Sequence, residues 1–402
     1  MPKFVEEYYL ALVLSTRAHA KILKIDATKA LSAEGVVAFY SAKDIPDKHR
    51  FQGPLLHDEE VFVSEKVTCH GQIIGAIVAI NQSIAQNASR MVEVEYEDLQ
   101  PLVITIEDAI RHRSYFNETA QRISRGDAEK GFKESAHILE GEVRTGGQEH
   151  FYLETNATIA VPKEEDEIEV FCSTQHPSEV QKLIAHVLNL HAHKIVVRVK
   201  RLGGGFGGKE SRASLLALPV AFAAHKLKKP IRCMLDRDED IMITGSRHPF
   251  LMKYKVGFDD SGLIKSARIY MYINGGYSHD LSPAVLERAM FHYENSYNIP
   301  ACEVYGHVCK TNIPSNTAFR GFGGPQGMFV AETMIRHIAE YLNIEASNVS
   351  NLNLYQEGDS THYNQILTNC TVQRCWDECV SSSNYNERLA QVQKYNRWQV
   401  GY

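Results

Sequence analysis

A glycine-rich segment between a predicted strand and a predicted helix restricts the fold more than any other feature of the sequence. Residues 201–210 read RLGGGFGGKE, with five glycines in six positions. The run KIVVRVKR before them is typical of a strand, and residues 211–227 are typical of a helix. Because glycine has no Cβ, such a loop can bring backbone N–H groups and a helix N-terminus close to an anion.

Taken alone, this loop allows three interpretations. From Gly203 it satisfies the GxGxxG pattern of dinucleotide-binding folds, and Asp236 follows the next predicted strand, where a ribose-binding acid could stand. The phosphate-binding pattern GxxxxGK also fits up to Lys209, but Glu210 replaces the Ser or Thr that would bind magnesium. The third interpretation is a tight turn without a ligand.

A second loop of the same kind makes an accidental turn a poorer explanation. Residues 319–326 read FRGFGGPQ and again precede a predicted helix. Two Gly-Phe-Gly-Gly loops, each with backbone donors beside one aromatic ring, could form two walls of a slot for a flat anionic cofactor and a flat substrate. Phe206 and Phe322 could instead be ordinary core residues, but their glycine neighbours leave little core to pack against. We therefore expect both rings to face a ligand.

Length and composition predict an ordinary globular protein with at least two domains. The 402 residues exceed the ~100–200 that one domain usually contains. A net charge of −6 provides no basic surface for nucleic acid. Glu6 and Glu7 interrupt the apolar run that a secretory signal would need, and no stretch of about 18 apolar residues could span a membrane. We therefore expect no nucleic-acid partner and no membrane partner.

The order of predicted strands and helices indicates an α+β fold with a boundary near residue 110. Residues 1–110 alternate short apolar strands with one helix at 83–91. Residues 111–134 include a polar stretch without apolar periodicity, which favours a linker. Residues 135–402 contain longer strands followed by helices and end in what looks like one charged helix. No closing strand follows, so we expect this second domain to be truncated.

Cysteine and histidine spacings do not favour a bound metal ion. Eight cysteines are too few for a disulfide scaffold in a chain of this length, and they indicate thiols of a reducing compartment. Cys370, Cys375 and Cys379 have spacings that favour one packed helix face over a zinc site. His150, between Glu149 and a distant Glu154, lacks a third ligand at a suitable spacing.

Several longer motifs follow one another along the chain: GGQEHFYLET, CSTQHPSEVQ, RLGGGFGGKES, CMLDRDEDIMITGSRHPF and PSNTAFRGFGGPQG. Together they closely resemble the eukaryotic xanthine dehydrogenase/oxidase family of molybdenum hydroxylases, in order from near Lys3 to near Trp398. The resemblance implies an α/β hammerhead domain followed by the first part of a molybdopterin-binding domain. This division agrees with the boundary drawn from the secondary-structure pattern.

The resemblance also implies roles for individual residues around the cofactor. Gln175 matches the glutamine beside the molybdenum centre. Phe206 matches the residue whose loop backbone contacts the cofactor, and Arg320 matches a further cofactor contact. Phe322 resembles the aromatic residue that stacks on the substrate.

Glu210 and Arg288 match the two charged residues that orient a purine in this family, where aldehyde oxidases carry uncharged residues. A carboxylate and a guanidinium on opposite sides of a slot can hydrogen-bond to opposite edges of a purine ring. The arginine would also stabilise negative charge that develops on the ring, and losing such a group typically lowers the rate by on the order of a hundredfold. These two residues are the expected catalytic and substrate-binding pair.

The same resemblance implies cofactors and partners. It implies Mo-molybdopterin for this chain, FAD and [2Fe-2S] clusters for domains outside it, and NAD or oxygen as the electron acceptor. The full-length protein would be a homodimer that converts hypoxanthine and xanthine to urate, in the cytoplasm or the peroxisome. The family's glutamate base and second stacking phenylalanine have no counterpart in this sequence, so we expect the isolated chain to be inactive and to bind the cofactor weakly.

Two other functions stay open. One is a Rossmann-type nicotinamide-dependent oxidoreductase built on the Gly203 loop. The other is a non-catalytic assembly module with the same fold, against which a charged pair such as Glu210 and Arg288 argues.

Overall fold

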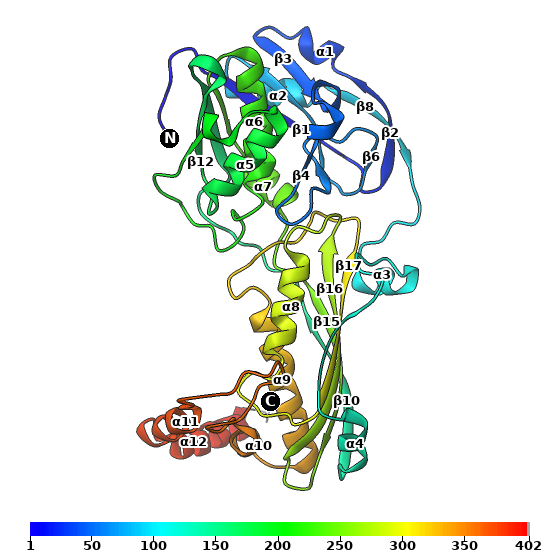
Figure 1. Cartoon of the computed structure of the whole chain (residues 1–402), viewed down its shortest axis with the longest axis vertical. Helices are drawn as coiled ribbons and strands as arrows, with labels where there is room; N and C mark the ends of the chain where they lie inside the picture. The colour runs from blue at the N-terminus through cyan, green and yellow to red at the C-terminus, as the bar shows by residue number, and fades with distance from the viewer. Residues whose placement is uncertain (400–402) are drawn as a thin grey trace.

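The computed structural model describes residues 1–399 and shows two lobes stacked along one long axis (Figure 1). Residues 400–402, the end of the expected second domain, lie outside the described residues. The strands are β1 (Tyr8–Leu14), β2 (Ala20–Asp26), β3 (Val36–Ser41), β4 (Phe51–Gln52), β5 (Glu59–Glu60), β6 (Lys66–Val67), β7 (Ile73–Ala79), β8 (Glu93–Asp98), β9 (Gln121–Arg125), β10 (His137–Thr145), β11 (Ala157–Pro162), β12 (Ile168–Cys172), β13 (Ile195–Arg198), β14 (Ile231–Met234), β15 (Phe250–Phe258), β16 (Ile264–Gly276) and β17 (Cys302–Lys310).

Helices cover the sheets of both lobes and also form the C-terminal end of the described chain (Figure 1). They are α1 (Thr28–Leu31), α2 (Gln82–Ser89), α3 (Ile106–His112), α4 (Ala128–Lys133), α5 (Pro177–Leu188), α6 (Ser214–Leu227), α7 (Arg237–Thr244), α8 (Ser282–His292), α9 (Gly324–Leu342), α10 (Ala346–Asn353), α11 (Val372–Ser382) and α12 (Tyr385–Gln399), with short 3-10 turns at Ala42–Asp44, Asp47–His49, Glu164–Asp166 and Ala192–Lys194.

The upper lobe is built around one seven-stranded sheet that both predicted domains share. Its strand order is β13-β12-β11-β14-β1-β7-β3. β1 pairs in parallel with β14, with Tyr8 opposite Ile231. Leu10 and Leu12 of β1 are buried in the same core as Leu216 of α6. Part of the N-terminal hundred residues therefore shares one hydrophobic core with residues 160–243.

The lower lobe is a five-stranded sheet, β10-β15-β16-β17-β9, covered by α8 and α9. Residues 111–134, whose polar sequence predicts a linker, instead contain β9 and α4. β9 is the edge strand of this sheet and pairs with β17, from Gln121 opposite Gly306 to Arg125 opposite Cys302. The side chains of β9 are half-buried or exposed because an edge strand needs no apolar face.

Most predicted elements are present, with small shifts at their ends. The helix expected to begin at residue 211 begins at Ser214, because the loop before it continues as turns. The single charged helix expected at the C-terminus is wrong: α11 and α12 are separate, and Asn384 between them has φ +50°, a left-handed conformation that ends a helix.

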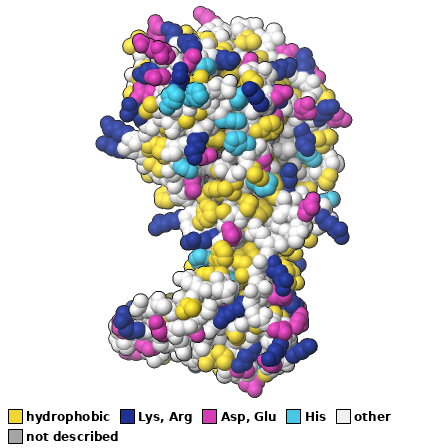
Figure 2. Space-filling view, viewed as in Figure 1, with side chains coloured by type: hydrophobic (Ala, Val, Ile, Leu, Met, Phe, Trp, Pro, Cys, Tyr) yellow, Lys and Arg dark blue, Asp and Glu magenta, His cyan; other side chains and the backbone are white. Residues whose placement is uncertain are grey.

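Surface charge on the face shown in Figure 2 is mixed, with acidic and basic side chains interspersed and hydrophobic side chains gathered at the waist between the lobes. Within residues 1–399, no helix has both the length and the apolar character needed to cross a bilayer.

Candidate functional site

The first glycine loop lies where β13 leads into α6, at the lower end of the upper lobe. Phe206 and Gly207 have φ +52° and +102°, so the chain turns through left-handed conformations here. A Cβ at Gly207 would collide with the carbonyl oxygen of Ala318, just before the second loop. Only glycine therefore allows the two loops to approach this closely.

Gln175 joins the first loop from the connection between β12 and α5. Its backbone N–H donates to the carbonyl oxygen of Lys209 at 2.8 Å. Its side-chain Oε1 accepts from the N–H of Gly207 at 2.9 Å and from that of Lys209 at 3.3 Å. Within the described residues, Nε2 of Gln175 has no hydrogen-bond partner, so this amide group can donate to a ligand.

The second glycine loop touches the first. The N–H of Arg320 donates to the carbonyl oxygen of Phe206 at 2.9 Å. Phe319 is held between the ring of His150, 4.5 Å away centre to centre, and the guanidinium of Arg247, 3.9 Å from the ring centre. The two Gly-Phe-Gly-Gly loops expected to form one site therefore lie side by side.

The joined loops carry backbone donors with no partner among residues 1–399. These are the N–H groups of Gly204, Gly205, Phe206, Gly321 and Gly323. The Phe206 side chain is 47% exposed, so this part of the first loop is open to solvent. Unpaired backbone donors on an open glycine loop are suited to binding an anionic group.

The two aromatic rings of these loops differ in environment. Phe206 is exposed, whereas Phe322 is half-buried and packs partly against the core of the lower lobe. Phe322 has φ +50°, nearly the same as Phe206, so both loops use the same unusual backbone conformation. Left-handed conformations of non-glycine residues are costly and are often found at functional sites.

Glu210 follows the first loop and is half-buried. Burial, together with the nearby charge of Asp280, raises the pKa of its carboxyl group, and His176 opposes this shift. Within the described chain, its carboxylate forms no hydrogen bond and no ion pair. Glu210 is thus a partly buried carboxyl group without a protein partner, which costs the folded chain some stability. A ligand-binding acid would have such an environment.

Arg288 is an exposed residue of α8, and no acid of the described residues pairs with its guanidinium. The second loop packs on the same helix, because a Cβ at Gly323 would collide with the carbonyl oxygen of Val285. Glu210 is linked to the start of this helix, since the Ser211 hydroxyl donates to Asp280 at 2.6 Å. The second loop thus packs on the helix that carries Arg288, and the residue after Glu210 is hydrogen-bonded to Asp280, shortly before that helix.

Sequence reasoning missed the residues that hold the first loop from behind. Lys209 is fully buried, and its Nζ donates to the carbonyl oxygen of Glu154 at 2.6 Å and to the Ser173 hydroxyl at 2.8 Å. Glu154 in turn accepts from the N–H of Gly203 at 2.8 Å. The lysine after the glycines was the visible signal, but it supports the loop instead of pointing to a phosphate.

The surroundings of this loop do not fit a dinucleotide-binding fold. β11 is antiparallel to both β12 and β14, so the run of parallel strands on which such folds depend is absent from this sheet. Asp236, the candidate ribose-binding acid, caps the start of α7 and accepts from the Gln86 side chain at 2.8 Å.

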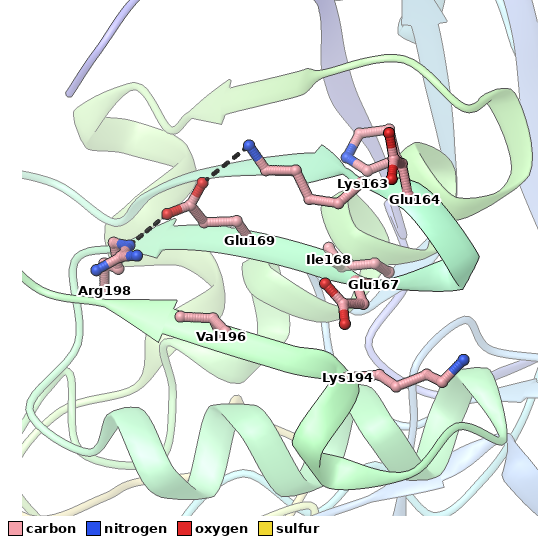
Figure 3. A pocket seen from close by; sticks show the side chains of 9 residues that line it. Lys163, Glu164, Glu167, Ile168, Glu169, Lys194, Val196 and Arg198 are labelled. Carbon is pink, nitrogen blue, oxygen red and sulfur yellow. Dashed lines mark hydrogen bonds and ion pairs between the residues drawn. The ribbon is translucent and has the colours of Figure 1, made fainter.

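Two hollows lie along β13. One of about 970 Å³ lies beside β13 and the N-terminal residues, and it is also lined by Arg201 at the start of the first loop and by Glu154, which accepts from the N–H of Gly203. Another of about 640 Å³ lies along β12 and β13, where Glu169 pairs with both Lys163 and Arg198 (Figure 3). Most side chains lining the second hollow are charged, and three of them, Lys163, Glu169 and Arg198, are held in ion pairs with one another.

Both parts of the chain match known protein families. Residues 2–100 match the a/b hammerhead domain of aldehyde oxidase and xanthine dehydrogenase. Residues 111–354 match a molybdopterin cofactor-binding domain. These matches confirm the fold and the cofactor expected from the sequence motifs.

Individual relatives of the chain point to the same family. The chain is 58% identical to a xanthine dehydrogenase of Calliphora vicina and 53% identical to a xanthine dehydrogenase/oxidase of Gallus gallus, over 99% of its length in each case. It spans only 29% of the length of either relative.

Solved structures show the same fold. The aldehyde oxidoreductase from Desulfovibrio gigas superposes with a TM-score of 0.90 at 24% identity, over 98% of this chain and 44% of that one. Quinoline 2-oxidoreductase from Pseudomonas putida superposes with a TM-score of 0.87 at 23% identity, over 99% of this chain and 53% of that one. The chain therefore belongs to the xanthine dehydrogenase/oxidase family of molybdenum hydroxylases, of which it carries the hammerhead domain and a molybdopterin cofactor-binding domain.

Proposed function

We propose that this chain provides the purine-recognition side of a molybdenum hydroxylase site that acts on xanthine and hypoxanthine. The observation that carries the proposal is the contact between the two glycine loops, with Glu210 at the end of the first loop and Arg288 on α8, the helix on which the second loop packs. Neither charged side chain has a protein partner among the described residues. A half-buried acid without a partner costs the fold some stability, and a ligand that pairs with Glu210 accounts for that cost, while the exposed guanidinium of Arg288 is free to bind the same ligand.

The residues present fit a molybdopterin cofactor. The unpaired N–H groups of the two loops, the free amide of Gln175 and the exposed guanidinium of Arg320 form a set of donors, as an anionic pterin requires. When bound, the cofactor supplies the redox chemistry of hydroxylation. The part of this chain is to hold it at Phe206 and to orient the substrate beside it.

Glu210 and Arg288 give the site its preference for purines. A carboxyl group whose pKa is raised can donate to a ring nitrogen when protonated and accept from a ring N–H when ionised. Arg288 can donate two parallel hydrogen bonds to a carbonyl-bearing edge of the ring and stabilise negative charge there. Phe322 would stack on the ring face, as the family motif implies.

The remaining expectations concern the full-length protein, and they follow from the family to which the chain belongs. Because the chain spans under a third of its relatives' length, we propose that FAD, [2Fe-2S] clusters and the catalytic base are supplied by other parts of a full-length homodimer. We propose the cytoplasm as its compartment. On the same basis, the isolated chain should bind less than one molybdenum per chain and form no urate from xanthine.

A chimera tests the proposal. The chain replaces the matching segment of the Calliphora vicina relative, and bound molybdenum and urate formation from xanthine are measured. We expect molybdenum near one per chain and clear urate formation. A folded chimera that binds molybdenum but forms no urate would contradict the purine assignment, and one that binds no molybdenum would contradict the cofactor assignment.

A further inference from the structure

Three buried charged side chains lie behind Glu210, at the junction of the two lobes. Arg212, two residues after Glu210, donates from Nη1 to Glu59 at 2.5 Å and lies 3.5 Å from Asp280. The side chains of Arg212, Glu59 and Asp280 are 2%, 1% and 0% exposed. Burying three charges is costly unless their geometry is fixed by further hydrogen bonds.

Each member of this network comes from a different part of the fold. Glu59 belongs to β5 in the hammerhead domain, Arg212 precedes α6, and Asp280 precedes α8. Glu59 also accepts from the Tyr277 hydroxyl at 2.7 Å and the Ser278 hydroxyl at 2.6 Å. The hammerhead domain therefore holds the segment that leads into α8, the helix of Arg288.

The network also reaches both glycine loops. The Ser211 hydroxyl, next to Glu210, donates to Asp280 at 2.6 Å and lies 3.1 Å from the Thr317 hydroxyl, which precedes the second loop. Asp280 has φ +38°, a strained conformation that its surroundings must maintain. Loss of the network would release the first loop, the second loop and the start of α8 together.

We propose that Glu59, Arg212 and Asp280 form a charge network that positions Glu210 relative to α8, so that the hammerhead domain takes part in substrate recognition. These are positioning residues, since none of them lies on the open face of the glycine loops. The inference rests on the proposed function for the roles of Glu210 and Arg288.

The first test needs no substrate and uses the 402-residue chain with the substitution Glu59→Gln. This change keeps the shape of the side chain but leaves Arg212 without its full counter-charge. We expect amide hydrogen exchange to become about tenfold faster at the hydrogen-bonded amides of Glu210, Ser282 and Arg320, because all three depend on the network.

Glu294→Gln is the matched control. Glu294 is also buried and also accepts several hydrogen bonds, from the Tyr355 hydroxyl and from His362. This variant should speed exchange near residues 290–297 and leave the Glu210 amide unchanged. Equal exchange at Glu210, Ser282 and Arg320 in Glu59→Gln and wild type would overturn the proposal.

The second test separates positioning from stability in the chimera. Glu59→Gln should raise KM for xanthine about tenfold, and the triple variant Glu59→Gln/Arg212→Met/Asp280→Asn, which removes all three buried charges, should regain thermal stability while KM stays raised. Recovery of KM together with stability would show a structural role only and would overturn the proposal. A parent chimera without turnover would instead contradict the proposed function, and the exchange experiment would still decide the network.

Discussion

Glu210 and Lys209 are neighbours in the chain with opposite environments. Lys209 is fully buried and donates to oxygen atoms of Glu154, Thr155 and Ser173, whereas Glu210 is half-buried and has no partner among the described residues. The motif places both on one loop, but spacing along the chain does not show which side chain turns inward. That difference decides which of the two can meet a ligand.

The pKa of Glu210 gives a prediction at this scale. Because burial and Asp280 raise the pKa above that of the unfolded chain, the folded state binds more protons, and the stabilising effect is fully present below the unfolded value of 4.5. It is lost as the pH rises through the folded pKa. Glu210→Gln lacks this titration, so it should gain stability relative to wild type at pH 7 but not at pH 4, as measured by urea unfolding. An equal difference at both pH values would contradict the assigned environment.

The residues of the candidate site can be predicted from the sequence more readily than the residues that hold them in place. Gln175, Phe206, Glu210 and Arg320 lie within recognisable motifs, and the structure brings them to one junction. The residues that support the loop region lie far away in the chain: Glu154 is 55 residues before Lys209, and Glu59 is 153 residues before Arg212. Hydrogen bonds over such separations leave no local pattern.

At the scale of elements, local patterns predict the two glycine loops and the strands and helices beside them, and they lead us to expect one shared site, but they do not show how closely the two loops approach. That contact depends on Gly207, whose left-handed φ and closeness to Ala318 both exclude a side chain. The polar strand β9 was missed because edge strands need no apolar alternation.

Gly207→Ala should therefore lower the free energy of unfolding by more than about 2 kcal/mol, from backbone strain and from the collision with Ala318. Gly146→Ala is the control, since a Cβ there meets no atom within 4 Å, and it should change stability by less than about 0.5 kcal/mol. Urea unfolding of both variants gives the comparison. Similar stabilities would mean that the two loops do not meet as described.

At the scale of the whole molecule, the predicted boundary near residue 110 divides the sequence but not the structure. The seven-stranded sheet contains strands from both sides of this boundary. Residues on one face of β1 and β7, such as Leu12 and Val78, pack into the core shared with α6. Residues on the other face, such as Val13 and Ile77, pack into a small core of their own. The pattern of apolar residues predicts the strands, but it cannot show which distant segment covers each face of the sheet.

Residues 1–105 expressed alone should consequently lack a cooperative transition, because one face of β1 and β7 would be exposed to solvent. The full chain should unfold these strands together with α6. Circular dichroism during urea unfolding distinguishes the two cases, and a sharp transition of the fragment would show an independent domain.

Substrate preference tests the central claim most directly. In the chimera, kcat/KM is measured for xanthine and for an aromatic aldehyde in the parent and in the double variant Glu210→Gln/Arg288→Gln. We predict that kcat/KM for xanthine falls by on the order of a hundredfold or more while that for the aldehyde changes little, since an aldehyde has no ring edges for these groups. Equal losses for both substrates, or unchanged xanthine turnover, would contradict the account.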